Sequence, residues 1–137
     1  IFAFGLPGLD VRFGWSNVPV PIVLMADVVV LLAYGLFIAV MRENRFAART
    51  VRVEAGQQVI SSGPYHWVRH PMYVAAILMT VISPLALGSY WAMLPALLII
   101  PVLMVRIVNE EKILTAELPG YREYMAQTKY RLVPWVW

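Results

Sequence analysis

The sequence predicts an all-α membrane protein, a polytopic bundle of helices that cross the bilayer more than once. Two properties of the composition support this fold class: 61% of the 137 residues are hydrophobic, and only 14% are charged. Soluble domains carry about 25% charged residues, so this chain is too apolar for that class. The third observation is that the apolar residues gather in long runs with short polar segments between them. At this length we expect a single domain over residues 1–137.

The first two segments are expected to differ in structure. Residues 1–21 contain repeated Gly and Pro, and we expect them to form an outer loop. Residues 22–41 carry one charge, Asp27, and the run matches the roughly 20 residues that cross the hydrocarbon core as a helix. The chain starts at Ile1 inside an apolar stretch, so we expect that an N-terminal span ahead of it is missing.

Two further apolar segments, residues 72–87 and 92–108, are separated by a short turn around Gly88. Such a short connection predicts an antiparallel helical hairpin, made of two spans, over residues 72–108. The last segment, residues 109–137, is amphipathic and rich in aromatic residues. We expect it to be a cytoplasmic tail that contains a helix at the membrane interface.

The basic residues predict the orientation of the chain in the membrane. Residues 42–71 and the tail hold most of them: Arg42, Arg45, Arg49, Arg52, Arg69, Lys112, Arg122, Lys129 and Arg131. Only Arg12 is expected on the opposite side. Since Lys and Arg are enriched in cytoplasmic segments, both basic segments are expected to face the cytoplasm. The first four of these arginines follow spacings of three and four, which would place them on one face if the helix continues past the bilayer.

Residues 63–73 form the most unusual segment, because they hold two His, two Tyr, two Pro, an Arg and a Trp in an otherwise aliphatic chain. The segment directly precedes a span, so we expect it where the membrane meets water. His66 and His70 lie four residues apart, but Pro71 biases His70 away from helix, and a metal site would need further ligands. No metal site is expected. The aromatic residues suit either an interfacial belt or the walls of a ligand pocket.

Arg106 and Glu110 are the second polar group, at the inner end of the third span and on one helix face. One interpretation is an ion pair at the membrane edge with no further role. The other is a functional site, because ionisable groups within spans often mark one. Both polar groups are expected on the same membrane face, which favours a shared site.

These residues together resemble a known family. The pattern consists of residues 63–65 and 68–73, then Arg106, Glu110, Glu111 and residues 120–124. It resembles the isoprenylcysteine carboxyl methyltransferase family, which includes the phospholipid methyltransferases, over about residues 40–134. Residues 7–15 look like the bacterial branch of that family. The resemblance implies an integral membrane methyltransferase of a bacterial inner membrane, which uses S-adenosylmethionine and faces the cytoplasm.

The resemblance also implies roles for individual residues. The cofactor pocket would be formed by Gln57, Gln58, Val59, Ile60, Tyr65, His70, Pro71, Met72, Tyr73 and Glu110. Arg106 would bind the acceptor's carboxylate, and Arg106, Glu110 and His70 would be the catalytic group. Independently, a carboxylate suits the cations of S-adenosylmethionine and aromatic side chains suit its adenine. The product would be S-adenosylhomocysteine.

Several alternatives stay open at this point. The acceptor could be a prenylated carboxylate, which Arg106 favours, or a phospholipid amine or a small thiol. A different class of function is a non-catalytic membrane scaffold that binds anionic lipid head groups through its arginine-rich loop, where each charge contributes about 1 kcal/mol. Membrane lipid is an expected partner and nucleic acid is not. The oligomeric state cannot be predicted from the sequence.

Overall fold

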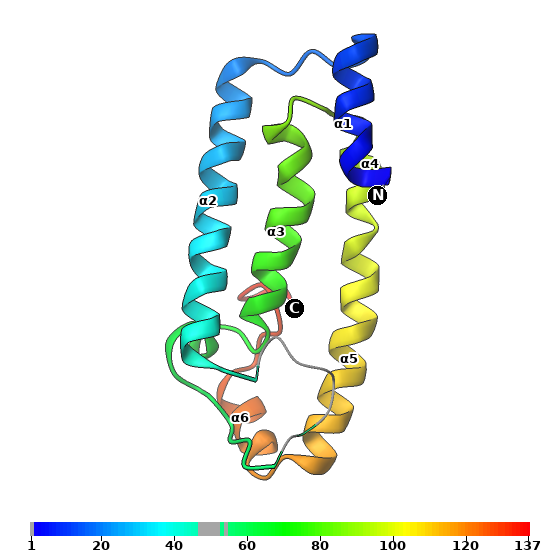
Figure 1. The fold of residues 1–137 in the computed structure, drawn as a ribbon. Helices are drawn as coiled ribbons and strands as arrows, with labels where there is room; N and C mark the ends of the chain where they lie inside the picture. Colours follow the sequence, from blue (N-terminus) through cyan, green and yellow to red (C-terminus); the bar gives the residue numbers. More distant parts are fainter. Residues whose placement is uncertain (1, 47–52, 54) are drawn as a thin grey trace. The chain divides into compact units, whose positions relative to one another are not determined.

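The computed structural model describes residues 2–46, 53 and 55–137, and all regular structure in these ranges is helical. The predicted fold class is therefore confirmed. The elements are α1 (Phe2–Phe13), α2 (Val20–Glu43), the 3₁₀ helix η1 (Gly63–His66), α3 (Pro71–Ala86), α4 (Met93–Leu97), α5 (Ile99–Glu117) and α6 (Tyr121–Gln127) (Figure 1).

Two stretches are long and apolar enough to cross a membrane: Val20–Glu43, which is α2, and Met93–Glu117, which comprises α4 and α5. They agree with the first and third predicted spans, although the second stretch continues nine residues past the predicted end at 108. The predicted second span is α3, a shorter apolar helix of 16 residues. At 1.5 Å per residue it is about 24 Å long, below the roughly 30 Å of a hydrocarbon core.

The expectation of a loop over residues 1–21 is wrong for its first half, because α1 covers Phe2–Phe13 despite Pro7 within it. A proline removes one backbone donor and disturbs one turn, whereas the apolar residues on both sides still favour a helix. Gly14 ends the helix in the left-handed region, with φ +64°. A glycine in this conformation just after the last turn is a common helix terminator.

The described residues divide into two compact units, and the first comprises residues 1–34 and 75–102. It buries the carboxylate of Asp10 in α1, whose residue is 1% exposed. Asp10 accepts hydrogen bonds from the backbone N–H and the hydroxyl of Ser16, both at 2.6 Å, and from the hydroxyl of Ser89. These contacts fasten the end of α1 to the turn between α3 and α4.

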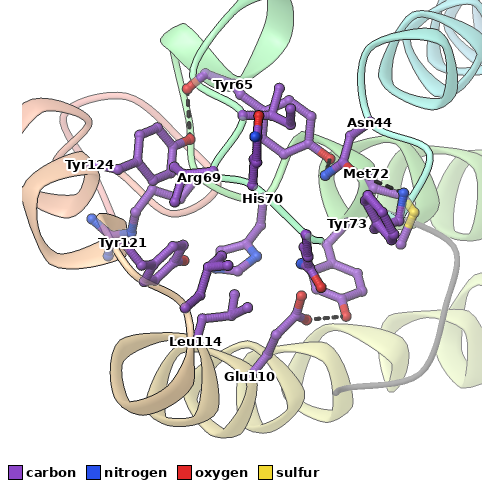
Figure 2. A pocket seen from close by; sticks show the side chains of 16 residues that line it. Asn44, Tyr65, Arg69, His70, Met72, Tyr73, Glu110, Leu114, Tyr121 and Tyr124 are labelled. Atoms are coloured by element: carbon purple, nitrogen blue, oxygen red, sulfur yellow. Dashed lines mark hydrogen bonds between the residues drawn. The ribbon is translucent and has the colours of Figure 1, made fainter. Parts of the chain in front are cut away.

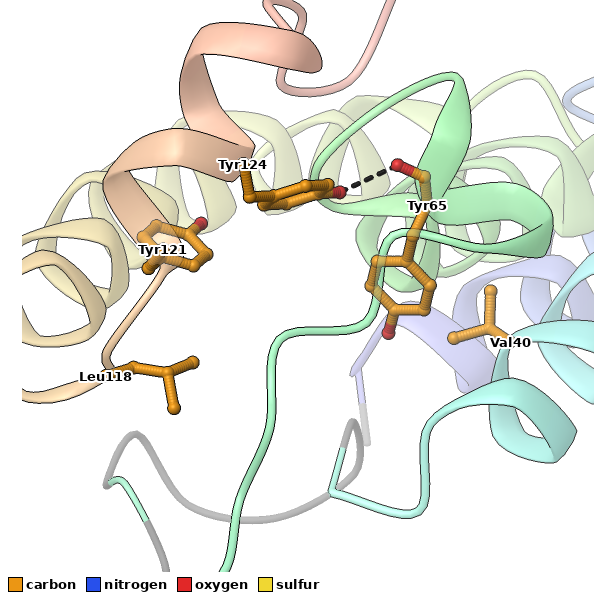
Figure 3. Close-up of a cluster of buried hydrophobic side chains, with 5 residues drawn as sticks. All are labelled: Val40, Tyr65, Leu118, Tyr121 and Tyr124. Carbon is orange, nitrogen blue, oxygen red and sulfur yellow. Dashed lines mark hydrogen bonds between the residues drawn. The ribbon is translucent and has the colours of Figure 1, made fainter.

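The second unit comprises residues 35–74 and 103–137. Its core is a cluster of five buried side chains, drawn in Figure 3: Val40, Tyr65, Leu118, Tyr121 and Tyr124. Two backbone hydrogen bonds join the C-terminal tail to the residues just before α3. The Arg69 N–H donates to the Tyr130 carbonyl, and the His70 N–H donates to the Arg131 carbonyl, both at 2.9 Å. The unit therefore brings the polar segment 63–73 together with the end of α5 and the tail.

The arginine-rich segment is only partly described. Arg42 lies in the last turn of α2, whereas Arg45 follows the helix, which ends at Glu43. The predicted continuation of one arginine face also involves Arg49 and Arg52, which lie outside the described residues.

Candidate functional site

One pocket in the second unit collects most of the residues predicted for a site (Figure 2). Of the ten residues expected to bind the cofactor, all except Pro71 line it. Its full lining is Asn44, Phe46, Gln57, Gln58, Val59, Ile60, Tyr65, Arg69, His70, Met72, Tyr73, Glu110, Leu114, Leu118, Tyr121 and Tyr124. The pocket therefore joins residues 44–73 with residues 110–124. This agrees with the prediction that the two polar groups share one site.

Local sequence explains how η1 carries Tyr65 into the pocket. Gly63 has φ +59°, which favours glycine, and Pro64 follows at the start of the helix, where a missing N–H does no harm. Tyr65 is buried, and its hydroxyl accepts a hydrogen bond from Asn44 Nδ2 at 3.1 Å. Its backbone carbonyl accepts one from the Tyr124 hydroxyl at 2.7 Å. Tyr65 thus connects the end of α2 with α6.

The Tyr73 hydroxyl connects two charged residues of α5, Arg106 and Glu110. It donates to Glu110 Oε2 at 2.5 Å and accepts from Arg106 Nε at 2.9 Å. The Arg106 guanidinium also lies 5.9 Å from the centre of the Tyr73 ring, within cation–π range. Arg106 and Glu110 are therefore coupled through a phenol on α3.

Glu111 holds a second, buried group of charges beside the pocket. Its residue is 5% exposed, and its Oε1 accepts from Arg69 Nε at 2.7 Å and lies 3.1 Å from His70 Nε2. Its Oε2 accepts from Arg131 Nε at 2.8 Å. Arg69 donates further to the carbonyls of Thr128 and Lys129 at 2.9 and 2.7 Å. A buried carboxylate with several such donors fixes their geometry, so Glu111 sets the position of the His70 ring.

The buried phenols of the pocket are kept neutral by their surroundings. Burial raises the pKa of Tyr65 to about 12. Burial also raises the pKa of Tyr121 and of Tyr124 well above the usual value of a tyrosine, and nearby carboxylates act in the same direction. All three therefore remain hydrogen-bond donors at physiological pH.

Two predicted site residues lie outside the pocket lining. Pro71 is buried at the first position of α3, which makes it a helix starter rather than part of the wall. Arg106 is exposed and contacts the hydroxyl of Tyr73. His66 is also exposed and lines a different hollow with Trp67 and the tail.

Sequence reasoning missed the wall that α6 supplies. The sequence predicts an interfacial helix in the aromatic tail, but Tyr121 and Tyr124 of this tail are 5% and 4% exposed and line the pocket. Their spacing of three residues puts them on one helix face, and Gly120, with φ +83°, starts that helix. Asn44 and Leu114 also line the pocket without having been predicted.

The arrangement can bind a ligand that carries both positive charge and an aromatic ring. Glu110 supplies a half-buried carboxylate, and four tyrosines and Met72 supply polarisable walls. The amides of Asn44 and Gln58 add donors and acceptors to the lining.

Comparison with known proteins agrees with these observations. The model of the isoprenylcysteine carboxyl methyltransferase family matches residues 23–116, well over half of the chain. A search of curated proteins gives no match. Together with two helices long enough to cross a membrane, the family match identifies the chain as a membrane methyltransferase. This chain therefore belongs to the isoprenylcysteine carboxyl methyltransferase family.

Proposed function

We propose that this chain is an S-adenosylmethionine-dependent enzyme that methylates a lipidic carboxylate of the prenylcysteine type. Its site faces the cytoplasm at a bacterial inner membrane. The observation that carries the proposal is the pocket of Figure 2, in which a half-buried carboxylate and four tyrosines line one cavity. The family membership supports the reaction class.

The residues of the pocket fit the proposed cofactor. S-adenosylmethionine presents two cations, a carboxylate and an adenine ring. Glu110 complements a cation, and the tyrosine rings complement a flat aromatic base. The Tyr121 hydroxyl is buried with no hydrogen-bond partner among the described residues, as expected of a group that a ligand satisfies.

The bound cofactor supplies an electrophilic methyl group on a sulfonium. The residues of this chain then orient the two reactants and exclude water, which supports an in-line displacement. A carboxylate acceptor is already an anion at neutral pH, so no general base is required. His70, whose ring is held by Glu111 and stacks on Tyr73 with centroids 5.7 Å apart, is proposed to hold the cofactor in place.

Arg106 is the proposed anchor of the acceptor. It is exposed, whereas its contact with Tyr73 brings it next to Glu110 at the edge of the pocket. A guanidinium binds a carboxylate through two parallel hydrogen bonds, so this position suits an anionic acceptor.

Calorimetric titration of the detergent-purified chain with S-adenosylmethionine tests the cofactor. Glu110→Gln should lower the affinity about 10- to 100-fold, the effect of losing a hydrogen bond to a charged group. Glu117→Gln is the matched control, because Glu117 is exposed on the same helix and outside the pocket lining. Unchanged binding in Glu110→Gln would remove Glu110 from the site. A folded chain that binds no cofactor would favour the lipid-binding scaffold.

A further inference from the structure

The hydroxyl of Tyr121 is the one buried side-chain polar atom without a hydrogen-bond partner in the part of the chain that the structure describes. Tyr121 is 5% exposed and lies in the wall of the pocket. Leaving a buried hydroxyl unpaired is unfavourable, because the group has lost its hydrogen bonds to water without gaining others. Such groups are rare in native proteins, and in a ligand pocket a hydrogen bond to a bound ligand explains one.

The other three tyrosines of this pocket provide the contrast. The Tyr124 hydroxyl donates to the Tyr65 carbonyl, the Tyr65 hydroxyl accepts from Asn44, and the Tyr73 hydroxyl contacts both Glu110 and Arg106. These three phenols are used by the fold itself. Tyr121 differs, because its ring packs in the same cluster as Tyr124, yet its hydroxyl is left for another partner.

The surroundings of Tyr121 indicate which part of a ligand it meets. It belongs to the hydrophobic cluster with Leu118 and Tyr124, against which Leu114 and Val59 pack. The charges of Glu111 and Arg69 also act on its hydroxyl. Figure 2 shows Tyr121 and Leu114 on one side of the pocket, whereas Tyr73 and Glu110, which form the charged network, lie on the other. The rings and aliphatic side chains around Tyr121 suit a flat base, and the Glu110 carboxylate suits the cations of the same ligand.

We propose that the Tyr121 hydroxyl donates a hydrogen bond to the adenine ring of an S-adenosyl ligand, an inference that rests on the proposed function. Adenine nitrogens are acceptors, and a neutral phenol is a donor to them. Burial raises the pKa of Tyr121, so the proton needed for this bond is present at physiological pH. Tyr121 would then recognise the base rather than take part in methyl transfer.

The test compares Tyr121→Phe with Tyr124→Phe in the detergent-purified chain, using S-adenosylhomocysteine as the probe. Each substitution removes one buried hydroxyl and keeps the ring. Tyr121→Phe should leave the thermal stability of the ligand-free chain unchanged or raised, because no protein hydrogen bond is lost. It should weaken binding of the probe about tenfold, measured by calorimetry. Tyr124→Phe should lower the stability of the ligand-free chain, because it breaks the bond to the Tyr65 carbonyl.

Methylthioadenosine, which has the adenosine half but no amino-acid half, locates the contact within the ligand. Tyr121→Phe should weaken the binding of both probes by the same factor. A loss with S-adenosylhomocysteine alone would overturn the assignment to adenine. Equal affinity of the variant and the natural chain for both probes, or a loss of ligand-free stability as large as that of Tyr124→Phe, would overturn the role of Tyr121. If the natural chain binds neither probe, the proposed function itself fails, and this outcome is distinct from the others.

Discussion

Glu110 and Glu111 are adjacent in α5, yet their side chains have different partners. Glu110 contacts the Tyr73 hydroxyl in the pocket, whereas Glu111 binds Arg69, His70 and Arg131. Successive residues of an α-helix point about 100° apart, so a pair of acids at a helix end can serve two groups at once. The first carboxylate remains available to a ligand, and the second stabilises the wall around it.

Arg106 allows a prediction at this scale about the acceptor. Arg106→Ala should raise the KM for a farnesylated cysteine with a free carboxylate on the order of tenfold, because a guanidinium–carboxylate contact is lost. Binding of S-adenosylhomocysteine should change little, because Arg106 is outside the pocket lining. Steady-state kinetics and calorimetry measure the two effects separately.

Arg106→Lys is the matched variant, because it keeps the charge but loses the planar pair of donors. Its KM for the acceptor should therefore lie between that of the natural chain and that of Arg106→Ala. The carboxamide of the same acceptor, which lacks the carboxylate, serves as a competitive inhibitor whose inhibition constant should be little changed by either variant. An equal loss of cofactor affinity and of acceptor KM in Arg106→Ala would make Arg106 a structural partner of Tyr73 and Glu110.

The proximity of Glu110 to Arg106 could be predicted from the sequence, whereas the partners of Glu111 could not. Arg106 and Glu110 are one helical turn apart, so local spacing alone indicates their proximity. The partners of Glu111 lie 42, 41 and 20 residues away in the sequence, and only the fold brings them together. No local periodicity reveals such contacts.

At the scale of elements, Glu111 links the C-terminal tail to the start of α3, because it binds Arg131 of the tail as well as Arg69 and His70. We expect Glu111→Gln to lower the thermal stability of the detergent-purified chain markedly, because it leaves buried Arg69 without its counter-charge. Removing one partner of a buried ion pair costs about 3–5 kcal/mol. Differential scanning calorimetry measures the change in Tm.

Arg131→Ala is the graded comparison for this prediction. The Arg131 side chain is 30% exposed, so its loss should cost about 1 kcal/mol or less, as for partly exposed pairs. The two variants should therefore differ clearly in Tm. If Glu111→Gln were as mild as Arg131→Ala, the buried group would not be what holds the tail in place.

The helix ends show how far element prediction from the sequence succeeds. The predicted run 72–87 became Pro71–Ala86, because a proline starts this helix and Gly88, with φ +74°, follows it. The prediction failed where apolar content competed with Pro and Gly, as in α1. The expected helix of the tail is present as α6, whereas the burial of Tyr121 and Tyr124 was not predicted. An aromatic residue near a membrane span suits both the interface and a core, and only packing separates the two.

At the scale of the whole molecule, the family match and the pocket cover different parts of the chain. The match extends over residues 23–116, whereas Leu118, Tyr121 and Tyr124 of the pocket lie beyond it. The pocket nevertheless lies entirely within the second compact unit. Its last wall therefore comes from the C-terminal region, whose residues 120–124 belong to the pattern that resembles the family.

The orientation of the chain in the membrane gives the last prediction. Basic residues dominate the segments after α2 and after α5, so the positive-inside rule predicts that both face the cytoplasm. The sequence contains no Cys, so a single introduced thiol can be labelled without background. Leu87→Cys, in the turn after α3 at a residue that is 52% exposed, should react with a membrane-impermeant maleimide in intact cells.

Arg122→Cys, at an exposed position of α6, is the matched variant on the other side of the Met93–Glu117 stretch. It should react only after the membrane is opened, because a helix of that length separates the two positions. Reaction of Arg122→Cys in intact cells, with Leu87→Cys protected, would reverse the orientation and place the site outside the cytoplasm. Reaction of both thiols from the same side would mean that this stretch does not cross the membrane. The expected pattern would leave the site open to a water-soluble cofactor from the cytoplasm, next to the bilayer from which a lipidic acceptor enters.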